Sequence, residues 1–342
     1  MRVLVNPHLR LGAVPAPSTE ARAFHAALPG YAPTPVHDVS SLAPGAGDVR
    51  LKDESDRLGL PAFKVLGASW AIERALREHP DVHTLVAASA GNHGRAVAHV
   101  AAARGLRARV FLPARSVAAR REAIAGEGAE VVVVDGTYED AVAAATREST
   151  LDGRLEISDV GSSRPAAWVV DGYATLFAEA AEQAAPDVLV VPVGVGSLAA
   201  AAARFGAQAG VKVVGVEPVA AACLTASLAA GEPVRIDTPG TAMAGLDCAE
   251  VSAAAWPSLR AGIHGTVTVD DDESGAAMRA LATAGLAIGD SGAAALAALT
   301  AVLSDPDCAA LRDAIGLGPH SRVLLVATEG PTDPERYAAA VG

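Results

Sequence analysis

The chain has 342 residues, and 51% of them are hydrophobic. This length and composition suffice for a large core, built as one enzyme-sized body of two interleaved lobes. The chain carries 39 acidic against 27 basic residues, a formal net charge of -12. This charge repels polyanions, and no cluster of lysine and arginine stands out against it. Nucleic acid and anionic membranes are therefore poor partners.

Three cysteines, Cys223, Cys248 and Cys308, are widely spaced and include no Cys-x-x-Cys pair. This pattern indicates neither a disulfide framework nor a zinc site, and it fits a reducing cytoplasm. The apolar stretch at the amino terminus is too short for a signal peptide, and charged residues interrupt the long apolar stretches that follow. We expect a cytoplasmic protein without a membrane span.

Continuous runs of β-branched residues without two-residue alternation predict strands that are covered on both faces. These runs are 84–87, 108–112, 130–134, 188–193, 211–216 and 322–327. Between the runs lie Ala-rich stretches of helical length, which include 94–104, 116–127, 138–148 and 172–184. The repeated strand-helix units predict the α/β class, with two lobes that each hold an open parallel sheet and flanking helices.

The stretch 79–160 is predicted to form a smaller lobe with four strands and three helices. The larger lobe would combine residues 1–78 with residues 161–342, because the chain must return to complete a second sheet. The sequence contains no internal repeat, and it contains no long linker between the two lobes.

Lys64 opens an apolar helical run just after the turn-forming residues Gly59 and Pro61. A lysine amine in apolar surroundings loses its charge more easily and becomes a usable nucleophile or base. The alternative interpretation is a surface lysine whose stem packs against the protein while its amine stays in water.

The segment Ser89–Asn92 joins the predicted strand 84–87 to a helix that begins near His93. Its backbone amides can hold a carboxylate, and Asn92 can hydrogen-bond a phenolic oxygen. The alternative is helix capping by Ser89 or Asn92. His93 is predicted to pack or to cap, because no His-Glu-x-x-His motif or paired Cys/His spacing accompanies it, and no metal is assigned.

The segment Gly194–Leu198 follows the predicted strand 188–193 and precedes a helix, an arrangement that points free backbone N–H groups at a phosphate. A tight strand-to-helix connection is the alternative reading. The acidic run Asp270–Glu273 is expected to cap the helix after it. Cys248 is expected to be a small packing residue.

In this order, Lys64, the 89–93 turn and the glycine segment resemble the pyridoxal 5'-phosphate enzymes of the tryptophan-synthase β-chain fold. Six longer matches narrow the resemblance to the diaminopropionate ammonia-lyase family and extend over nearly the whole chain. These matches are Lys52–Ser55, Phe63–Gly67, Gly91–Arg95, Gly172–Leu176, Met243–Leu246 and Thr328–Asp333.

The resemblance implies a role for each site residue. Lys64 would form the internal Schiff base with pyridoxal 5'-phosphate, and Asn92 would contact the phenolic oxygen. Asp290 would lie close to the pyridine nitrogen, with Thr328 as a second candidate, and an acid there would strengthen the electron sink. The cofactor phosphate would be bound by Gly194, Val195, Gly196, Ser197 and Leu198, and the substrate carboxylate by Ser89, Ala90, Gly91 and Asn92.

The implied reaction is an α,β-elimination from 2,3-diaminopropionate or a related β-substituted α-amino acid, to give a 2-oxo acid and ammonia. Lys64 would take the α-proton, and Asp159, which matches a family aspartate, would protonate the leaving amine. The larger lobe would bind the cofactor, while the smaller lobe would move and close over the substrate. The family implies a homodimer.

Two departures leave the substrate open. Ala90 stands where the ammonia-lyase pattern has an aspartate, so this turn resembles that of threonine dehydratase. The segment from Asp159 to Trp168 is also shorter than the family's and lacks its Trp-Glu-Gly-Tyr stretch. A dehydratase or β-replacement enzyme is the first alternative, and a non-catalytic ligand-binding homologue the second. A dinucleotide-binding oxidoreductase ranks last, because no full Gly-x-Gly-x-x-Gly is present.

Overall fold

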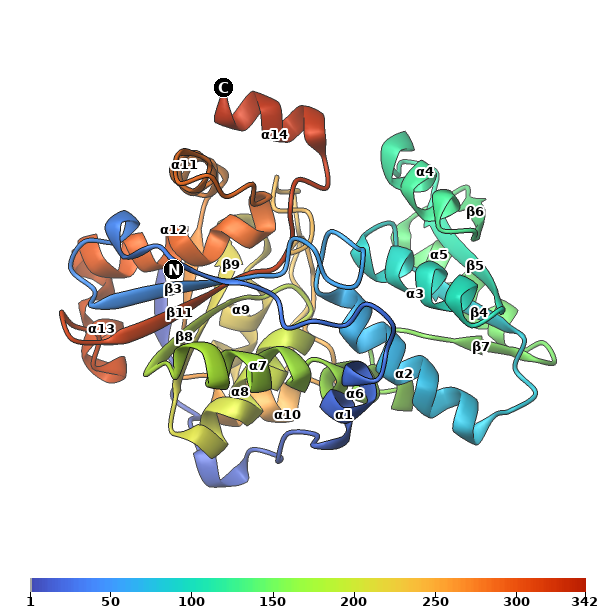
Figure 1. Ribbon diagram of the computed structural model, residues 1–342, viewed down its shortest axis with the longest axis horizontal. Coiled ribbons are helices and arrows are strands. Elements are labelled where there is room, and N and C mark those ends of the chain that lie inside the picture. The colour runs from blue at the N-terminus through green and yellow to red at the C-terminus, as the bar shows by residue number, and fades with distance from the viewer. Residues whose placement is uncertain (1) are drawn as a thin grey trace. The chain divides into compact units, whose positions relative to one another are not determined.

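The computed structural model describes residues 2–342, which form two compact units. The larger unit combines the chain up to Phe63 with Tyr173–Gly342, and the smaller unit is the continuous stretch Lys64–Gly172. Each unit is built around its own sheet with helices packed against it (Figure 1).

The larger unit has a seven-stranded sheet in the order β1-β10-β9-β8-β11-β3-β2. The five inner strands are parallel, and the two edge strands pair antiparallel to their neighbours. The strands are β1 Val3–Val5, β2 Val36–Asp38, β3 Asp48–Asp53, β8 Val188–Pro192, β9 Lys212–Pro218, β10 Gly265–Val269 and β11 Arg322–Ala327. Strands β8 and β10 are buried along their whole length, as expected for a sheet covered on both faces.

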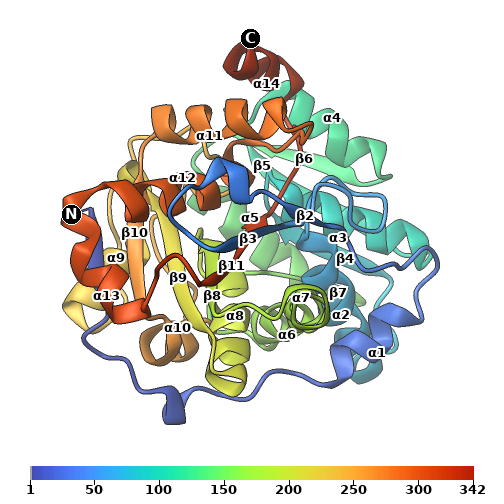
Figure 2. The same ribbon diagram turned by 60° about the vertical axis from the view of Figure 1, so that its left-hand side comes forward.

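Helices cover both faces of this sheet, with α11 and α12 on one side and α7, α8 and α10 on the other (Figure 2). Helix α12 packs closely on β8, β10 and β11, because most of its inward positions are alanine. The helices are α1 Glu20–Ala26, α7 Ala174–Ala184, α8 Ser197–Ala209, α9 Cys223–Ala230, α10 Trp256–Gly262, α11 Asp271–Thr283, α12 Asp290–Ser304, α13 Ala309–Ile315 and α14 Pro334–Val341.

The core of the larger unit lies between α12 and the sheet, where Val190, Val214, Leu296 and Leu325 are at most 3% exposed. Burying each such side chain contributes roughly 1.5–3 kcal/mol. In the described part of the chain no single helix is long and apolar enough to cross a membrane. Only the bent pair Asp290–Ser304 and Pro306–Ile315, with an angle of 94°, passes jointly on length and composition.

The smaller unit has a four-stranded, all-parallel sheet in the order β6-β5-β4-β7. Helices α3 and α5 both pack on β4 and β5. The strands are β4 Thr84–Ala88, β5 Arg107–Pro113, β6 Glu130–Val134 and β7 Arg154–Glu156, and the helices are α2 Lys64–Glu78, α3 Asn92–Ala103, α4 Ala118–Gly126, α5 Tyr138–Ser149 and α6 Arg164–Gly172. Short 3-10 helices elsewhere cover Leu11–Ala13, Ser40–Leu42, Val219–Ala221 and Pro306–Cys308.

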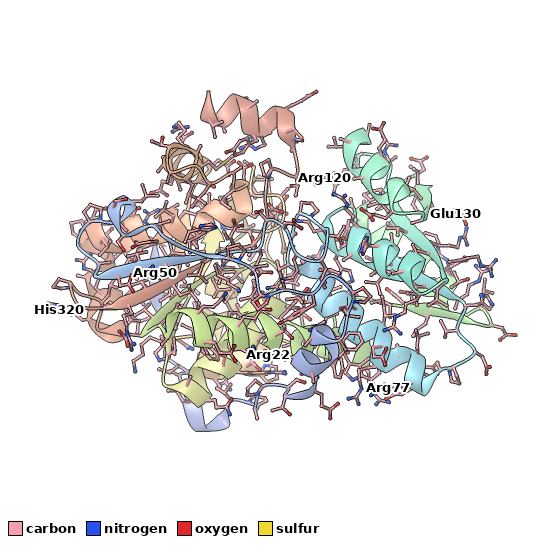
Figure 3. All side chains as sticks on the ribbon, viewed as in Figure 1. Arg22, Arg50, Arg77, Arg120, Glu130 and His320 are labelled. Atoms are coloured by element: carbon pink, nitrogen blue, oxygen red, sulfur yellow. The ribbon has the colours of Figure 1, made fainter. Side chains whose placement is uncertain are left out.

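The predicted α/β class with parallel sheets is confirmed, and all six predicted strands are present with ends shifted by one or two residues at most. The acidic run before α11 caps it as predicted. Asp270 accepts a hydrogen bond from the Glu273 N–H, and Glu273 accepts one from the Asp270 N–H, each at 2.9 Å. Many charged side chains lie on the surface, and Glu130 and Arg77 of the smaller unit and His320 of the larger unit are exposed examples (Figure 3).

The limits of the smaller unit differ from the predicted 79–160. Helix α2 packs against α3 and even more extensively against α6, so residues 64–78 and 161–172 join this unit rather than the larger one. Chain order alone does not predict this packing, because α2 precedes the predicted range 79–160 in the sequence and α6 follows it. The expected movement of the smaller unit stays a prediction.

Candidate active site

The parallel strands β4 and β7 bring two segments of the smaller unit together. Because they are neighbours, their carboxyl ends lie at one edge of the sheet. The Ile157 N–H donates to the Val86 carbonyl at 2.8 Å, so the chain leaving β7 continues alongside β4. The turn into α3 and the segment that carries Asp159 therefore meet.

Lys64 and Asp159 form an ion pair in this unit. Lys64 is the first residue of α2, and its Nζ donates to Asp159 Oδ2 at 2.7 Å. Burial raises the pKa of Asp159, but His93 and the Lys64 ammonium lower it more strongly, so the pKa lies below its usual range. The two side chains remain 20% and 14% exposed, which lets a small molecule reach both.

His93 lies behind this pair and is buried. Its Nε2 is 2.9 Å from the Ile157 carbonyl, which can only accept, so Nε2 carries the hydrogen and Nδ1 of the neutral ring does not. Nδ1 is 3.8 Å from Asp159 Oδ2 and has no hydrogen-bond partner among the described residues. Burial lowers the pKa of His93, which favours the neutral ring. The predicted packing role is confirmed, and Nδ1 additionally offers Asp159 an acceptor.

The turn Ser89–Gly91 leads from β4 into α3. The N-cap is Gly91, which has no side chain, and neither Ser89 nor Asn92 caps the helix as the alternative reading proposed. Ser89 Oγ instead accepts a hydrogen bond from the Gly91 N–H at 3.3 Å. The N-cap residue itself therefore places no side chain over the start of α3, which is the arrangement that suits an anion.

The glycine segment Gly194–Leu198 lies in the larger unit, between β8 and α8. Its N-cap Gly196 has a φ of +91°, and a Cβ there would come within 2.5 Å of Leu259 Cδ1. A Cβ at Gly194 would come within 2.7 Å of the Gly245 carbonyl. Only glycine fits these two positions, and the N-cap of α8, like that of α3, places no side chain over the helix start.

Asp290 and Thr328 also belong to the larger unit and are 9% and 4% exposed. Arg336 of α14 donates to Asp290 Oδ1 from Nε at 3.0 Å and from its terminal nitrogen at 2.8 Å. Both bonds use one oxygen, so Oδ2 takes part in neither. The sequence analysis missed this partner, since nothing in the C-terminal segment signals it.

The three lysines of the chain differ in their availability. Lys52 is fully buried, and its Nζ donates to three acceptors, the Thr34 carbonyl, Glu179 and Gln183. Lys212 begins β9, away from the predicted site residues of its unit in sequence. Lys64 is therefore the amine best suited to bond an aldehyde. Its own unit also holds the acid Asp159 beside it and the start of α3, whose N-cap is a glycine.

The predicted site residues divide between the two units. Lys64, Ser89, Ala90, Gly91, Asn92 and Asp159 lie in the smaller unit, and Gly194, Val195, Gly196, Ser197, Leu198, Asp290 and Thr328 lie in the larger unit. Each unit by itself supplies groups that suit a phosphorylated aldehyde working on amino acids. The smaller unit has an amine, an acid and a helix start with a glycine N-cap, and the larger unit has a second helix start with a glycine N-cap and a carboxylate. Over residues 2–342 no group of three or more His, Cys, Asp or Glu side chains is placed to hold a metal.

Comparisons with known proteins agree with this chemistry. The family described as "Pyridoxal-phosphate dependent enzyme" matches residues 27–329. Diaminopropionate ammonia-lyase of Salmonella typhimurium is 33% identical over 363 residues, which cover 93% of this chain and 90% of that protein. The crystal structure of the holo diaminopropionate ammonia-lyase from Escherichia coli covers 99% of this chain and 96% of its own, with a TM-score of 0.90 and 30% identity. The same enzyme in complex with an aminoacrylate-PLP azomethine reaction intermediate gives a TM-score of 0.89 at 31% identity and the same coverage.

Proposed function

Because the chain belongs to the family of pyridoxal-phosphate dependent enzymes, we propose that it is an ammonia-lyase acting on 2,3-diaminopropionate or a related β-substituted α-amino acid. The observation that carries the proposal is the ion pair of Lys64 and Asp159. It places a base for the α-proton beside an acid for the leaving amine, and an elimination that expels ammonia needs both.

When bound, pyridoxal phosphate supplies the electron sink that makes the α-proton removable. Lys64 attaches the cofactor and, once released, takes the α-proton on Nζ. Its ammonium must first lose a proton, and Asp159 Oδ2 is the acceptor at 2.7 Å. Asp159 then gives this proton to the β-nitrogen, which departs as ammonia. The α-proton on Nζ restores the starting pair, so the protons balance.

The environment of Asp159 supports this exchange. Its pKa is lowered in part by the Lys64 ammonium, and this influence ends when Lys64 becomes neutral. Burial then favours the uncharged carboxylic acid. His93 Nδ1, which carries no hydrogen in the neutral ring, can accept a hydrogen bond from that acid. The pair therefore titrates as a coupled unit.

The remaining contacts are proposed from the two helix starts that have a glycine N-cap. Residues Ser89–Asn92 at the start of α3 would bind the substrate carboxylate, and Gly194–Leu198 at the start of α8 would bind the cofactor phosphate. Asn92 would contact the phenolic oxygen. Asp290, whose Oδ2 is not used by Arg336, would face the pyridine nitrogen, with Thr328 as the other candidate.

The decisive test is the variant Lys64→Ala. Wild-type protein incubated with pyridoxal phosphate and reduced with borohydride should carry the cofactor on the peptide that contains Lys64, as read by mass spectrometry. Lys64→Ala should carry none and should not turn over diaminopropionate. Lys212→Ala is the control, because that lysine has no assigned role, and it should match the wild type. Full activity of Lys64→Ala would overturn the proposal.

A second candidate is a dehydratase or β-replacement enzyme, favoured by Ala90 in place of the family's aspartate. Product analysis with diaminopropionate, serine and threonine in parallel separates the two. Pyruvate and ammonia from diaminopropionate alone support the ammonia-lyase, whereas 2-oxo acids from the hydroxy amino acids alone support the second candidate. Bound cofactor without any turnover would indicate a non-catalytic homologue.

We further propose that the enzyme is a homodimer in the cytoplasm. The dimer rests on the family resemblance, and the reducing compartment rests on the wide spacing of the three cysteines, which include no Cys-x-x-Cys pair. Light scattering of the purified protein should give twice the mass of the chain, 34.2 kDa. A monomeric mass at working concentrations would contradict the dimer.

A further inference from the structure

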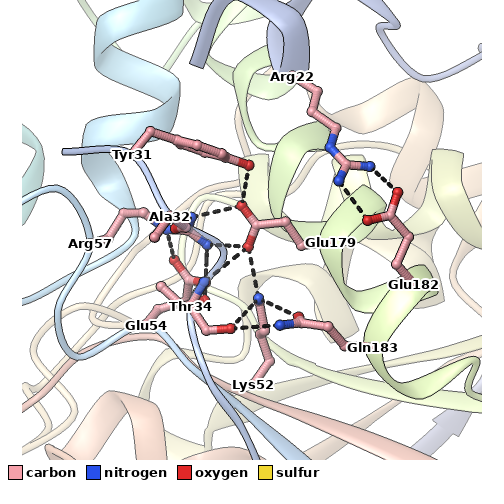
Figure 4. Close-up of polar contacts among 10 residues, drawn as sticks. All are labelled: Arg22, Tyr31, Ala32, Thr34, Lys52, Glu54, Arg57, Glu179, Glu182 and Gln183. Carbon is pink, nitrogen blue, oxygen red and sulfur yellow. Dashed lines mark hydrogen bonds and ion pairs between the residues drawn. The ribbon is translucent and has the colours of Figure 1, made fainter. Parts of the chain in front are cut away.

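Arg57 lies in the larger unit at the centre of a buried cluster of charges (Figure 4). Its guanidinium donates hydrogen bonds to two carboxylates, and it uses two of its nitrogens for each. Nε and one terminal nitrogen donate to Glu54 at 2.8 and 2.6 Å, and both terminal nitrogens donate to Glu179 at 2.8 Å. The Thr34 hydroxyl at 3.0 Å and the Ala32 carbonyl at 3.3 Å accept further bonds. This arrangement fixes the guanidinium plane in one orientation.

Lys52 completes the cluster. Its Nζ donates to Glu179 at 2.7 Å, to Gln183 at 2.7 Å and to the Thr34 carbonyl at 2.8 Å, so each of its three hydrogens has an acceptor. Burial raises the pKa of Glu179, but Arg57 and Lys52 lower it more, to about 2. Glu179 therefore stays ionised, and the cluster matches two basic side chains with two acidic ones. All four side chains are at most 1% exposed.

The chain makes a strained turn immediately after Arg57. Arg57 and Leu60 exchange two backbone hydrogen bonds of 2.8 and 3.1 Å, and both residues between them have positive φ, +54° at Leu58 and +80° at Gly59. A leucine in this conformation is strained and persists only where its surroundings hold it. The Arg57 cluster is the feature that holds this turn at its first residue.

The segment is fixed at its other end as well. The Phe63 N–H donates to the Thr328 carbonyl at 3.3 Å, and the Gly330 N–H donates to the Pro61 carbonyl at 3.0 Å. The Phe63 ring packs on Tyr173 with 4.8 Å between ring centres. The residue bonded to Phe63 is Lys64. The segment that leads to the lysine is therefore held by charges at Glu54–Arg57 and by backbone bonds at Pro61–Phe63.

We propose that Arg57, Glu54 and Glu179 are positioning residues, which hold the 54–63 segment so that Lys64 presents its amine to the aldehyde of pyridoxal phosphate. The inference rests on the role proposed for Lys64. In that condensation the amine nitrogen replaces the aldehyde oxygen, which leaves as water. Stability alone does not account for the cluster, because buried ion pairs stabilise no better than apolar residues of similar size. The paired hydrogen bonds of Arg57 fix the orientation of the segment as well, and a misplacement of about 1 Å slows a reaction up to a hundredfold.

The test compares two carboxylates of the same helix. Glu179→Gln removes a buried charge from α7, and Glu182→Gln removes an exposed one that also pairs through two nitrogens, with Arg22 at 2.5 and 2.6 Å (Figure 4). Apoprotein is mixed with pyridoxal phosphate well below its unfolding midpoint, and cofactor fixed by borohydride is followed with time. Glu179→Gln should attach cofactor at least about tenfold more slowly, and Glu182→Gln at the wild-type rate. Equal rates in all three proteins overturn the inference.

A second variant separates positioning from stability. The double variant Glu179→Gln, Lys52→Met removes one acidic and one basic side chain from the cluster. Its apoprotein should therefore recover the unfolding midpoint that the single variant loses. Cofactor attachment should stay slow, because Arg57 keeps only its paired hydrogen bonds to Glu54. Recovery of rate and midpoint together would overturn the inference. If Glu179→Gln does not fold, Arg57→Lys is read in the same way, since it keeps the charge and loses both sets of paired hydrogen bonds. A wild type that attaches no cofactor at Lys64 would instead overturn the proposed function.

Discussion

Lys64 and Asp159 lie 95 residues apart in the chain, yet Nζ of the first is 2.7 Å from Oδ2 of the second. The bond joins the start of α2 to the segment after β7, and in the proposed elimination it would carry the proton that passes from Lys64 through Asp159 to the leaving amine. Each residue is useful only while the other can give or take that proton.

Asp159→Asn should therefore separate attachment from turnover. Asparagine still accepts a hydrogen bond from Lys64 but cannot carry the proton to the leaving amine, so kcat should fall by about 10²–10⁴-fold. Cofactor attachment at Lys64 should persist. The control is Glu156→Gln, which removes a carboxylate three residues earlier that accepts a hydrogen bond from Thr146. A kcat near the wild-type value in Asp159→Asn would contradict the assignment.

The glycine segment gives a prediction with a control on the same helix. Gly196→Ala and Gly210→Ala both place alanine at positive φ, +91° and +73°, but only the first brings a Cβ against another side chain, Leu259. Both variants should lose about 1–2 kcal/mol of unfolding free energy. Only Gly196→Ala should also raise the dissociation constant of pyridoxal phosphate, by about tenfold or more, in a fluorescence titration. Equal dissociation constants would argue against phosphate binding there.

Ala90 predicts the stereochemistry. With Lys64 as its base, the wild type should act on one enantiomer of diaminopropionate, because a single base reaches one face of the α-carbon. Ala90→Asp restores the carboxylate of the family pattern and should raise turnover of the other enantiomer by at least about tenfold. Ala90→Asn is the matched control, since it has the same size and takes no proton. Ammonia release from each enantiomer is the measurement, and equal rates in the wild type would contradict the prediction.

His264 predicts how stability changes with pH. It is buried next to β10, and its Nδ1 accepts a hydrogen bond from the Val213 N–H at 3.2 Å. Burial, followed by the nearby charge of Lys212, lowers its pKa from 6.5 to about 4. The unfolded chain therefore binds this proton at higher pH than the folded protein does. The stability that neutral His264 contributes is complete above its ordinary pKa and is lost as the pH falls towards 4.

The size of this effect is about 1.4 kcal/mol per pKa unit, so a loss on the order of 3 kcal/mol is expected over the window. Urea unfolding midpoints at several pH values should show it. His264→Asn keeps an acceptor for Val213 and does not titrate, so its midpoint should change less over the same range. His320→Asn, at an exposed position, should follow the wild type. A steep loss that survives in His264→Asn would assign it to other groups.

Two strands, β3 and β10, could not be predicted from the sequence, because they contain polar residues that have partners only in the folded protein. β3 reads Asp-Val-Arg-Leu-Lys-Asp, and Lys52 is buried there only because Glu179, in a distant helix, balances its charge. β10 alternates threonine and valine as a half-exposed strand would, yet it is wholly buried, since the Thr266 hydroxyl bonds to Thr225. β1, β2 and β7 are only three residues long, too short to carry a pattern.

The site shows a similar division. Lys64, the 89–92 turn and the glycine segment could be recognised because their order and neighbours are local features of the sequence. Asp159 and Asp290 were named only through the family resemblance. The contacts of Lys64 with Asp159, Arg336 with Asp290 and Arg57 with Glu179 could not be predicted, because they join residues 46 to 122 positions apart. Charged residues on helices also have a default reading as solvated surface, which hides a buried Glu179.

The place of β11 in its sheet sets the order in which the protein can be completed during synthesis. β11 lies between β3 and β8 in the sheet, but it is synthesised after both of these neighbouring strands. The smaller unit is continuous and finished at Gly172, whereas the larger sheet keeps an open slot until Ala327 emerges. Unpaired strand edges of this kind attract other chains. A chain that stops short of β11 should therefore aggregate, even though every residue of the smaller unit is present.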